Sequence, residues 1–280
     1  MKKTILALLI ISSSAAFSQP VLKTPAPSPL QTVTQAFGLG DLKVEYSRPS
    51  MKGRVVFGEL VPFTGIWRTG ANQATKLTVA DDIKLNGTAL AAGTYAIYTM
   101  PSATEWTVMI YKDLTLGGNV ADYKTENELM RFKIRPSTMN DKMETFTIAF
   151  NDVTSTSCKM DLMWENTRVS IPVTTDIDGK IVKNIETIMN ADKRPYFAAA
   201  SYYYDNGKDM NKALEWVNKA VADNPDAYYM SHVKAKIQMK MGDNKGALAT
   251  ATASLAKAKE QKDDHYTQLN EKLIADLSKK

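Results

Sequence analysis

The chain contains very little cysteine and histidine. Among its 280 residues are one cysteine, Cys158, and two histidines, His232 and His265. A single cysteine excludes an intramolecular disulfide, and we expect Cys158 to be a buried apolar residue of a strand. Because no histidine precedes residue 232, the longer N-terminal part excludes a Ser-His-Asp or Cys-His catalytic site and a zinc site built from His and Cys. The sequence predicts no catalytic residue, metal ion or cofactor, and it places both histidines on helix surfaces.

Long apolar runs are also missing, apart from one short stretch near the beginning. Lys2 and Lys3 precede the apolar segment Ile5–Ile11, and Ala16 and Ser18 are small residues at the −3 and −1 positions of a signal-peptidase site. The apolar segment is shorter than the roughly 20 residues that a membrane-spanning helix needs. These features predict a signal peptide over residues 1–18, cleaved after Ser18. We therefore expect a periplasmic or secreted protein with no membrane span.

Positive charge is not concentrated in any part of the chain. The formal net charge is +5, and it becomes +3 without Lys2 and Lys3. Residues 19–190 hold 18 basic and 18 acidic residues, and residues 191–280 hold 15 and 12. A nucleic-acid-binding protein gathers positive charge on one face, and the Gly117-Gly118 pair lacks the spacing of a phosphate-binding loop. The sequence therefore predicts no nucleic-acid partner and no nucleotide site.

Alternation of apolar and polar residues dominates from Thr32 to Val173. The alternating runs are short and rich in β-branched and aromatic residues, as in half-buried strands. Eight or nine such strands predict an antiparallel β-sandwich over 31–175, with a barrel as the alternative. Four prolines in 19–30 predict an extended lead-in, and 119–130 predicts one short helical turn. The main runs are Leu42-Val44-Tyr46, Leu77-Val79, Tyr95-Ile97, Trp106-Val108-Ile110, Phe146-Ile148-Phe150, Met160-Leu162-Trp164 and Val169-Ile171-Val173.

After residue 175 the apolar spacing becomes helical. Residues 176–191 predict a linker helix with Asp178 as its N-cap. Over 192–280 the spacing predicts a tetratricopeptide-like helical stack, because Ala247-Leu248 repeats Ala213-Leu214 after 34 residues. A final amphipathic helix over 265–280 would close the stack. We expect this stack to contact another protein.

The segment from Tyr46 to Thr75 interrupts the strand pattern with no period of its own. Ordered loops of this length are uncommon unless they are packed or functional. Six of the seven arginines precede residue 190, and three of them lie here, at Arg48, Arg54 and Arg68. The guanidinium group has a fixed fork of donors, so these residues indicate defined geometry. The candidate ligand-binding residues are Arg48, Arg54, Trp67, Arg68 and Asn72.

Two interpretations of this segment remain open. In the first, the three arginines tie the loop to the sandwich through main-chain carbonyls and carboxylates, and Trp67 closes the core. In the second, two or more guanidinium groups converge on a pocket and bind a carboxylate or phosphate in bidentate fashion, with Asn72 and the backbone near Gly70 completing the site.

Aromatic and acidic residues of the sandwich offer further sites. Trp67, Trp106 and Trp164 would form a sugar-stacking platform if exposed, but the strand register of the last two favours the core. Paired carboxylates would support a glycosidase-type hydrolase, which needs two of them roughly 5–10 Å apart. No spacing in the sequence brings any two together. The acids considered are Glu45, Glu59, Asp81, Asp82, Glu105 and Glu165.

Several motifs of the β-region together resemble the domain-of-unknown-function family 2911. They are YSRPSMKGR, FGELVP, WRTGANQAT, AGTYAIYTMP and WTVMIY, and the resemblance covers about residues 27–173. It implies an exported bacterial protein in which helices of the tetratricopeptide type follow the matching part. The resemblance implies no activity and no catalytic residue.

Together these features predict an exported envelope protein that binds or scaffolds rather than catalyses. In this hypothesis the sandwich binds a small anionic or glycan ligand at residues 46–75, and the helical stack binds a protein. The alternative is a carboxylate-dependent hydrolase that acts on envelope carbohydrate.

Overall fold

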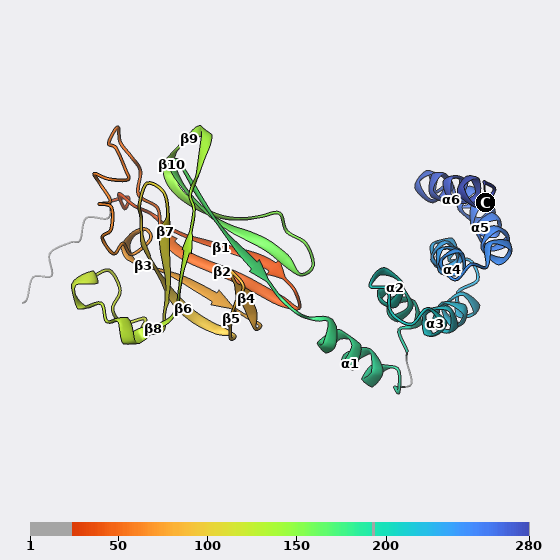
Figure 1. The fold of residues 1–280 in the computed structure, drawn as a ribbon. Coiled ribbons are helices and arrows are strands. Elements are labelled where there is room, and N and C mark those ends of the chain that lie inside the picture. Colours follow the sequence, from red (N-terminus) through yellow and green to blue (C-terminus); the bar gives the residue numbers. More distant parts are fainter. Residues whose placement is uncertain (1–23, 192–193, 280) are drawn as a thin grey trace, which may run out of the picture. The chain divides into compact units, whose positions relative to one another are not determined.

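A computed structural model describes residues 24–191 and 194–279 (Figure 1). The predicted signal peptide and residues 19–23 of the predicted lead-in lie outside the described residues. The chain divides into two compact units between Asp176 and Ile177. The predicted fold class, a β-rich N-terminal part followed by a helical C-terminal stack, is confirmed. No helix in the described ranges is long and apolar enough to cross a membrane.

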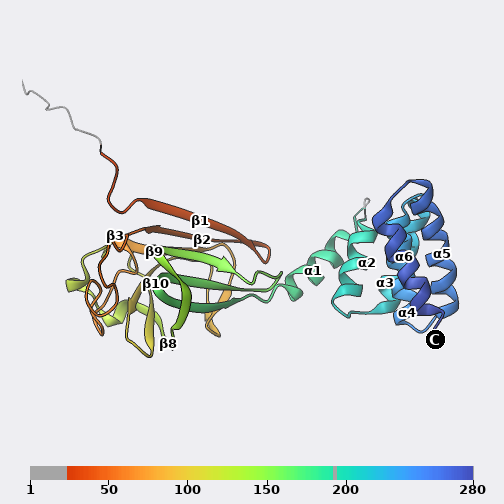
Figure 2. The same ribbon diagram turned by 90° about the horizontal axis from the view of Figure 1, so that it is seen from above.

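The first unit consists of two antiparallel sheets that lie face to face (Figures 1 and 2). Within the described residues, one sheet has six strands in the order β1-β2-β3-β6-β7-β8, and the other has four in the order β5-β4-β10-β9. The strands are β1 (Leu30–Phe37), β2 (Gly40–Ser47), β3 (Ala71–Val79), β4 (Ile83–Leu85), β5 (Thr88–Leu90), β6 (Gly93–Met100), β7 (Trp106–Tyr111), β8 (Glu128–Ile134), β9 (Ser137–Asn151) and β10 (Ser157–Thr174).

The main core fills the space between these sheets. Alternate residues of β2, Leu42, Val44 and Tyr46, are at most 1% exposed. Side chains of β9 and β10 such as Ile148 and Leu162 meet them from the other sheet. The period-two pattern thus marks the inward faces, and burial of this apolar surface is the main stabilising contribution. Cys158 belongs to the same core, as its surrounding pattern predicts.

One long strand, β10, replaces the two strands predicted from the runs that end at Trp164 and begin at Val169. The two core-facing positions are five residues apart, an odd number, so a regular strand cannot direct both inward. The pairing of β10 with β9 shifts register on both sides of Glu165, whose φ is +55°. A β-bulge at Glu165 therefore restores the inward direction and keeps the strand continuous.

A second, smaller core lies on the other face of the six-stranded sheet. Tyr98 of β6 and Met109 and Tyr111 of β7 are buried there. Residues 112–127, which include short 3₁₀ turns at Val120–Asp122 and Thr125–Asn127, cover them. β6 and β7 are therefore buried on both faces, which explains the almost continuous apolar sequence of β7. The sequence predicted one helical turn here but not the covered face.

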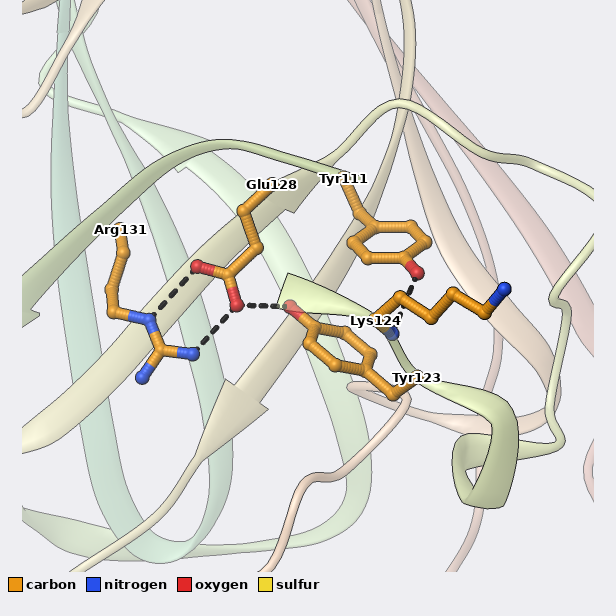
Figure 3. A network of polar contacts seen from close by, with 5 residues as sticks. All are labelled: Tyr111, Tyr123, Lys124, Glu128 and Arg131. Carbon is orange, nitrogen blue, oxygen red and sulfur yellow. Dashed lines mark hydrogen bonds and ion pairs between the residues drawn. The ribbon is translucent and has the colours of Figure 1, made fainter. Parts of the chain in front are cut away.

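A hydrogen-bonded network fastens the covering segment to the sheet (Figure 3). The Tyr123 hydroxyl donates to Glu128 Oε1 at 3.0 Å, and Arg131 donates to both Glu128 oxygens at 2.9 and 2.6 Å. The main-chain N–H of Lys124 donates to the Tyr111 hydroxyl at 3.1 Å. The bond from Arg131 holds the pKa of Glu128 below its usual value, so the carboxylate stays ionised.

The second unit is a stack of antiparallel helices. Among the described residues its helices are α1 (Asp178–Ile188), α2 (Tyr196–Asp205), α3 (Met210–Asp223), α4 (Tyr228–Lys240), α5 (Asn244–Glu260) and α6 (Asp264–Leu277). Ala213 and Ala247, the small residues that recur after 34 residues in the predicted repeat, are both fully buried. Asp178 is not the N-cap of α1, which is Ile177. Its carboxylate instead accepts from Tyr202 at 2.8 Å and pairs with Lys208, which ties α1 to the end of α2.

His232 of α4 is buried, contrary to the surface position expected from the sequence. It is 7% exposed, and its Nδ1 lies 2.9 Å from Asn270 Oδ1. Asn270 Nδ2 donates to Ser254 Oγ and to the Tyr266 carbonyl at 2.9 Å each, so Asn270 Oδ1 is the acceptor and His232 Nδ1 carries the proton. This network links α4, α5 and α6. His265 is exposed, as predicted.

Acid is expected to destabilise the helical stack through His232. Burial lowers the pKa of His232, and the positive charges of Lys236 and His265 act in the same direction against the bond from Asn270. An unfolded histidine titrates near pH 6.5, about its ordinary pKa. The contribution of neutral His232 to the stability of the folded stack is therefore complete above that pH. It is lost as the pH falls below it, because the histidine of the unfolded state binds a proton first. Thermal unfolding at decreasing pH measures this loss, which His232→Asn should reduce and His265→Asn should retain. An equal pH response in the two variants would contradict the assignment.

Candidate functional site

The segment predicted to be irregular connects β2 to β3 and touches the sheets at isolated points. Ser50 bridges to Thr145, and Trp67 bridges to Thr99 with main-chain hydrogen bonds of 2.7 and 2.9 Å. A further bridge joins Phe57 to Val61 within the segment. The loop is therefore held at a few positions, and its side chains supply the remaining contacts.

Arg48 fastens this segment to the four-stranded sheet. Its Nε donates to the Phe146 carbonyl at 3.0 Å, and its Nη2 donates to Thr147 Oγ1 at 2.7 Å. Its main-chain N–H donates to the Pro29 carbonyl at 2.9 Å. These partners match the structural interpretation of the arginines, and Arg48 does not line the pocket described below.

Arg54 and Arg68 also donate to main-chain oxygens, each with only part of the guanidinium group. Arg54 donates from Nε to the Met51 carbonyl at 2.7 Å and from Nη2 to the Ser50 carbonyl at 2.8 Å. Arg68 uses Nη1 alone, which lies 2.9 Å from the Gly118 carbonyl oxygen. Among the described residues, Arg54 Nη1 and Arg68 Nε and Nη2 have no hydrogen-bond partner, and neither group pairs with a carboxylate. Hydrogen bonds thus hold both arginines in place, and each guanidinium group keeps N–H donors that a ligand could use.

Trp67 is a core residue that also reaches the pocket. It is 9% exposed, stacks on Trp164 at a centroid distance of 5.9 Å, and contacts Phe146 at 5.1 Å. Its Nε1 donates to the Gly70 carbonyl at 2.9 Å. Trp106 and Trp164 are each 2% exposed, so the three indoles form no exposed sugar-stacking platform.

Asn72, at the start of β3, has a structural role. Its φ of +59° is in the left-handed region, which Asn tolerates better than most residues. Its Nδ2 donates to the Ser28 carbonyl at 3.2 Å and to Ser47 Oγ at 3.1 Å. The side chain thus joins the ends of β2 and β3, and it does not line the pocket.

A cavity of about 360 Å³ opens beside these residues, and we call it the arginine pocket. Its lining combines the two arginines with apolar side chains and contains no Asp or Glu. Such a lining suits a ligand that has one negatively charged end and an apolar body. The lining residues are Ser28, Pro49, Arg54, Leu60, Val61, Pro62, Gly65, Ile66, Trp67, Arg68, Gly70, Ala71 and Trp164.

The acids considered from the sequence are dispersed. Glu45 pairs with Lys43 at 3.0 Å, and Glu105 pairs with Lys133 at 2.8 Å. Glu165 alone of these acids lines a neighbouring cavity. Within the described ranges, no group of three or more His, Cys, Asp or Glu residues is placed to hold a metal ion. A glycosidase-type carboxylate pair therefore has no support from the lining of either cavity.

Gly118 is a site residue that sequence reasoning missed. Its carbonyl accepts from Arg68, and a Cβ on it would lie 2.1 Å from the Asn72 carbonyl oxygen. Only glycine allows the backbone at residue 118 to approach Asn72 so closely. This approach lets the segment 112–127 hold Arg68 through the Gly118 carbonyl. The Gly117-Gly118 pair was the available signal, but the sequence showed only that it lacks the spacing of a phosphate-binding loop.

Comparisons with known proteins agree with the resemblance seen in the β-region. Searches of curated proteins and of solved structures found no match. A family model described as "Protein of unknown function (DUF2911)" matches residues 28–173, which is more than half of the chain and spans β1 to β10. The chain belongs to the DUF2911 family.

Proposed function

We propose that this protein is an exported envelope protein that binds a small acid-bearing ligand in the arginine pocket. The observation that carries the proposal is the pair Arg54 and Arg68, which line one cavity without a described carboxylate to neutralise them. A ligand carboxylate or phosphate would accept from their unpaired donors, and such charge-assisted bonds are among the strongest in proteins. The signal peptide predicted from the sequence of residues 1–18 supports export.

The apolar part of the lining of the arginine pocket restricts the kind of ligand that fits. Leu60, Val61 and Ile66 line the cavity with apolar side chains, and Trp67 and Trp164 also belong to its lining. Such a surface favours a ring or hydrocarbon body beside the acidic group, because its burial removes apolar area from water. A free inorganic anion would leave this surface uncovered, so we expect organic acids to bind more tightly than phosphate.

We further propose that the helical stack is of the tetratricopeptide type and binds a protein partner. The 34-residue recurrence of Ala213 at Ala247, both fully buried in helices α3 and α5, supports this assignment. The competing hypothesis of a carboxylate-dependent hydrolase would require a pair of acids in the arginine pocket, whose lining contains no Asp or Glu.

Calorimetric titration with glucuronate, benzoate and inorganic phosphate tests the ligand proposal. Arg54→Ala should weaken binding of the organic acids about tenfold or more, since a hydrogen bond to a charged group contributes about 1.5–3 kcal/mol. Its effect on the melting temperature should be small, because Arg54 is exposed and bonds only within its own turn.

Arg48→Ala is the matched control. It removes the same charge from the same segment, but from outside the pocket, so affinity should stay within about twofold of wild type while the melting temperature falls. Loss of binding in Arg48→Ala equal to that in Arg54→Ala, or binding of none of the three probes by the wild type, would overturn the proposal.

A further inference from the structure

A second cavity of about 210 Å³ adjoins the arginine pocket, and we call it the Glu165 pocket. The two cavities are lined by residues that are neighbours in the chain. Pro62 and Trp164 line the arginine pocket, and the next residues, Phe63 and Glu165, line the Glu165 pocket. Phe57 lines the Glu165 pocket, and its ring contacts both tryptophans of the arginine pocket. Its centroid lies 6.0 Å from that of Trp67 and 6.2 Å from that of Trp164. The lining residues are Phe57, Phe63, Ser102, Ala103, Trp106, Pro136, Ser137, Thr138, Glu165 and Thr167.

The β-bulge in β10 aims a carboxylate into this second cavity. Glu165 Oε2 accepts from the main-chain N–H of Val56 at 3.2 Å, which holds the side chain in place. Glu165 Oε1 lies 3.7 Å from Lys142 Nζ, too far for a strong hydrogen bond. This oxygen therefore keeps the capacity to accept from a ligand. A residue with positive φ beside a pocket is a feature of functional sites, since the strain of about 1–3 kcal/mol must be compensated elsewhere.

Four side chains with hydroxyl groups, Ser102, Ser137, Thr138 and Thr167, also line the cavity. The side-chain hydroxyls of Thr138 and Thr167 make no hydrogen bond to any described residue, and Ser137 Oγ makes one long bond of 3.4 Å. Each can donate and accept. One carboxylate surrounded by neutral hydroxyls suits a ligand with several hydroxyl groups of its own.

Phe63 supplies a flat apolar surface at this cavity. Its side chain is 41% exposed, although most large apolar residues of the sandwich are buried. The ring is held against the backbone, because a Cβ on Gly58 would lie 2.9 Å from Phe63 Cε2. A fixed, exposed ring can stack on the C–H face of a sugar with little loss of side-chain entropy.

We propose that the Glu165 pocket is a subsite for a neutral sugar ring, which stacks on Phe63 and donates its hydroxyls to Glu165. This inference rests on the proposed function, and it makes an acid-bearing oligosaccharide the ligand class of the whole site, with its acidic residue in the arginine pocket. An ammonium group is disfavoured as the occupant, because Lys142 already places a positive charge next to Glu165.

Calorimetric titration with three probes tests the subsite. They are a disaccharide of glucuronic acid linked to glucose, free glucuronate, and the same disaccharide with glucosamine in place of glucose. Phe63→Ala and Glu165→Gln should each weaken the glucose disaccharide about fivefold or more and change glucuronate affinity less than about twofold. Glutamine keeps an acceptor for the Val56 N–H, so the loop should stay in place. Val55→Ala is the control, since Val55 is 47% exposed in the same segment and lines neither cavity.

The outcomes separate this inference from the proposed function. Wild-type affinity for the disaccharide in both Phe63→Ala and Glu165→Gln would overturn the subsite, as would a disaccharide that binds no more tightly than glucuronate. The proposed function would survive either result if Arg54→Ala still weakened glucuronate. Tighter binding of the glucosamine probe would show a cation site instead and overturn the sugar assignment. Absence of binding by all three probes would overturn the subsite, and it would overturn the proposed function as well if benzoate and phosphate also failed to bind.

Discussion

Trp67→Ala is expected to lower the free energy of unfolding of the sandwich by about 3–5 kcal/mol, the usual cost of deleting a large buried aromatic side chain. Trp67 lies at the centre of an aromatic cluster, where it contacts Phe57, Phe146 and Trp164 at centroid distances of 5.1 to 6.0 Å. Those rings belong to the loop and to two strands, so they cannot collapse into the space that the indole leaves. The loss would be a large fraction of the stability of a typical domain, about 5–15 kcal/mol.

Urea denaturation followed by the fluorescence of the remaining tryptophans measures this loss. Trp67→Phe is the graded variant, because it keeps a ring but leaves the Gly70 carbonyl without its donor. We expect it to cost about 1–3 kcal/mol, the penalty for an unsatisfied buried polar group. A loss below about 1 kcal/mol in Trp67→Ala would contradict the assignment of Trp67 to the core.

Gly118→Ala is expected to destabilise the sandwich by about 1–3 kcal/mol, as overpacking does, and to weaken binding in the arginine pocket. The new Cβ would lie 2.1 Å from the Asn72 carbonyl oxygen and 2.8 Å from Arg68 Nη1. The first is a backbone atom in β3, which cannot move aside as a flexible side chain can. Residues 112–127 must therefore shift, and the bond that holds Arg68 is lost.

Denaturation and titration with glucuronate check both effects in one variant. Gly65→Ala is the stability control, because its Cβ would meet no atom closer than 3.7 Å, the Pro62 carbonyl oxygen. Its free energy of unfolding should change by less than about 0.5 kcal/mol. If Gly118→Ala were as stable as Gly65→Ala, the close packing of residues 112–127 on β3 would be wrong.

Much of the sandwich could be predicted because strands with one inward face carry a local signal. Leu42, Val44 and Tyr46 alternate with polar neighbours, and all three are buried. The odd spacing between Trp164 and Val169 was also a signal of the bulge, although we interpreted that spacing as a break between two strands. A parity argument on that spacing would have predicted one continuous strand with one extra residue.

The site was predictable only as a set of residue types. The sequence indicated that Arg48, Arg54, Arg68, Trp67 and Asn72 require defined geometry, and each has specific partners in the structure. It did not show which of them line a cavity, because that depends on contacts between residues far apart in the chain. Arg68 and Gly118 are one example, and Arg48 and Phe146 are another.

Local periodicity was enough to determine the β-rich and helical parts, since it depends on residues near one another in the chain. Composition was enough to show that the β-rich part has no histidine and a single cysteine for chemistry. Tertiary packing alone decided the separation of Arg48 from Arg54 and Arg68, the burial of His232, and the second core under residues 112–127. These features depend on which distant atoms satisfy a donor or cover a face. No short window of residues contains that information.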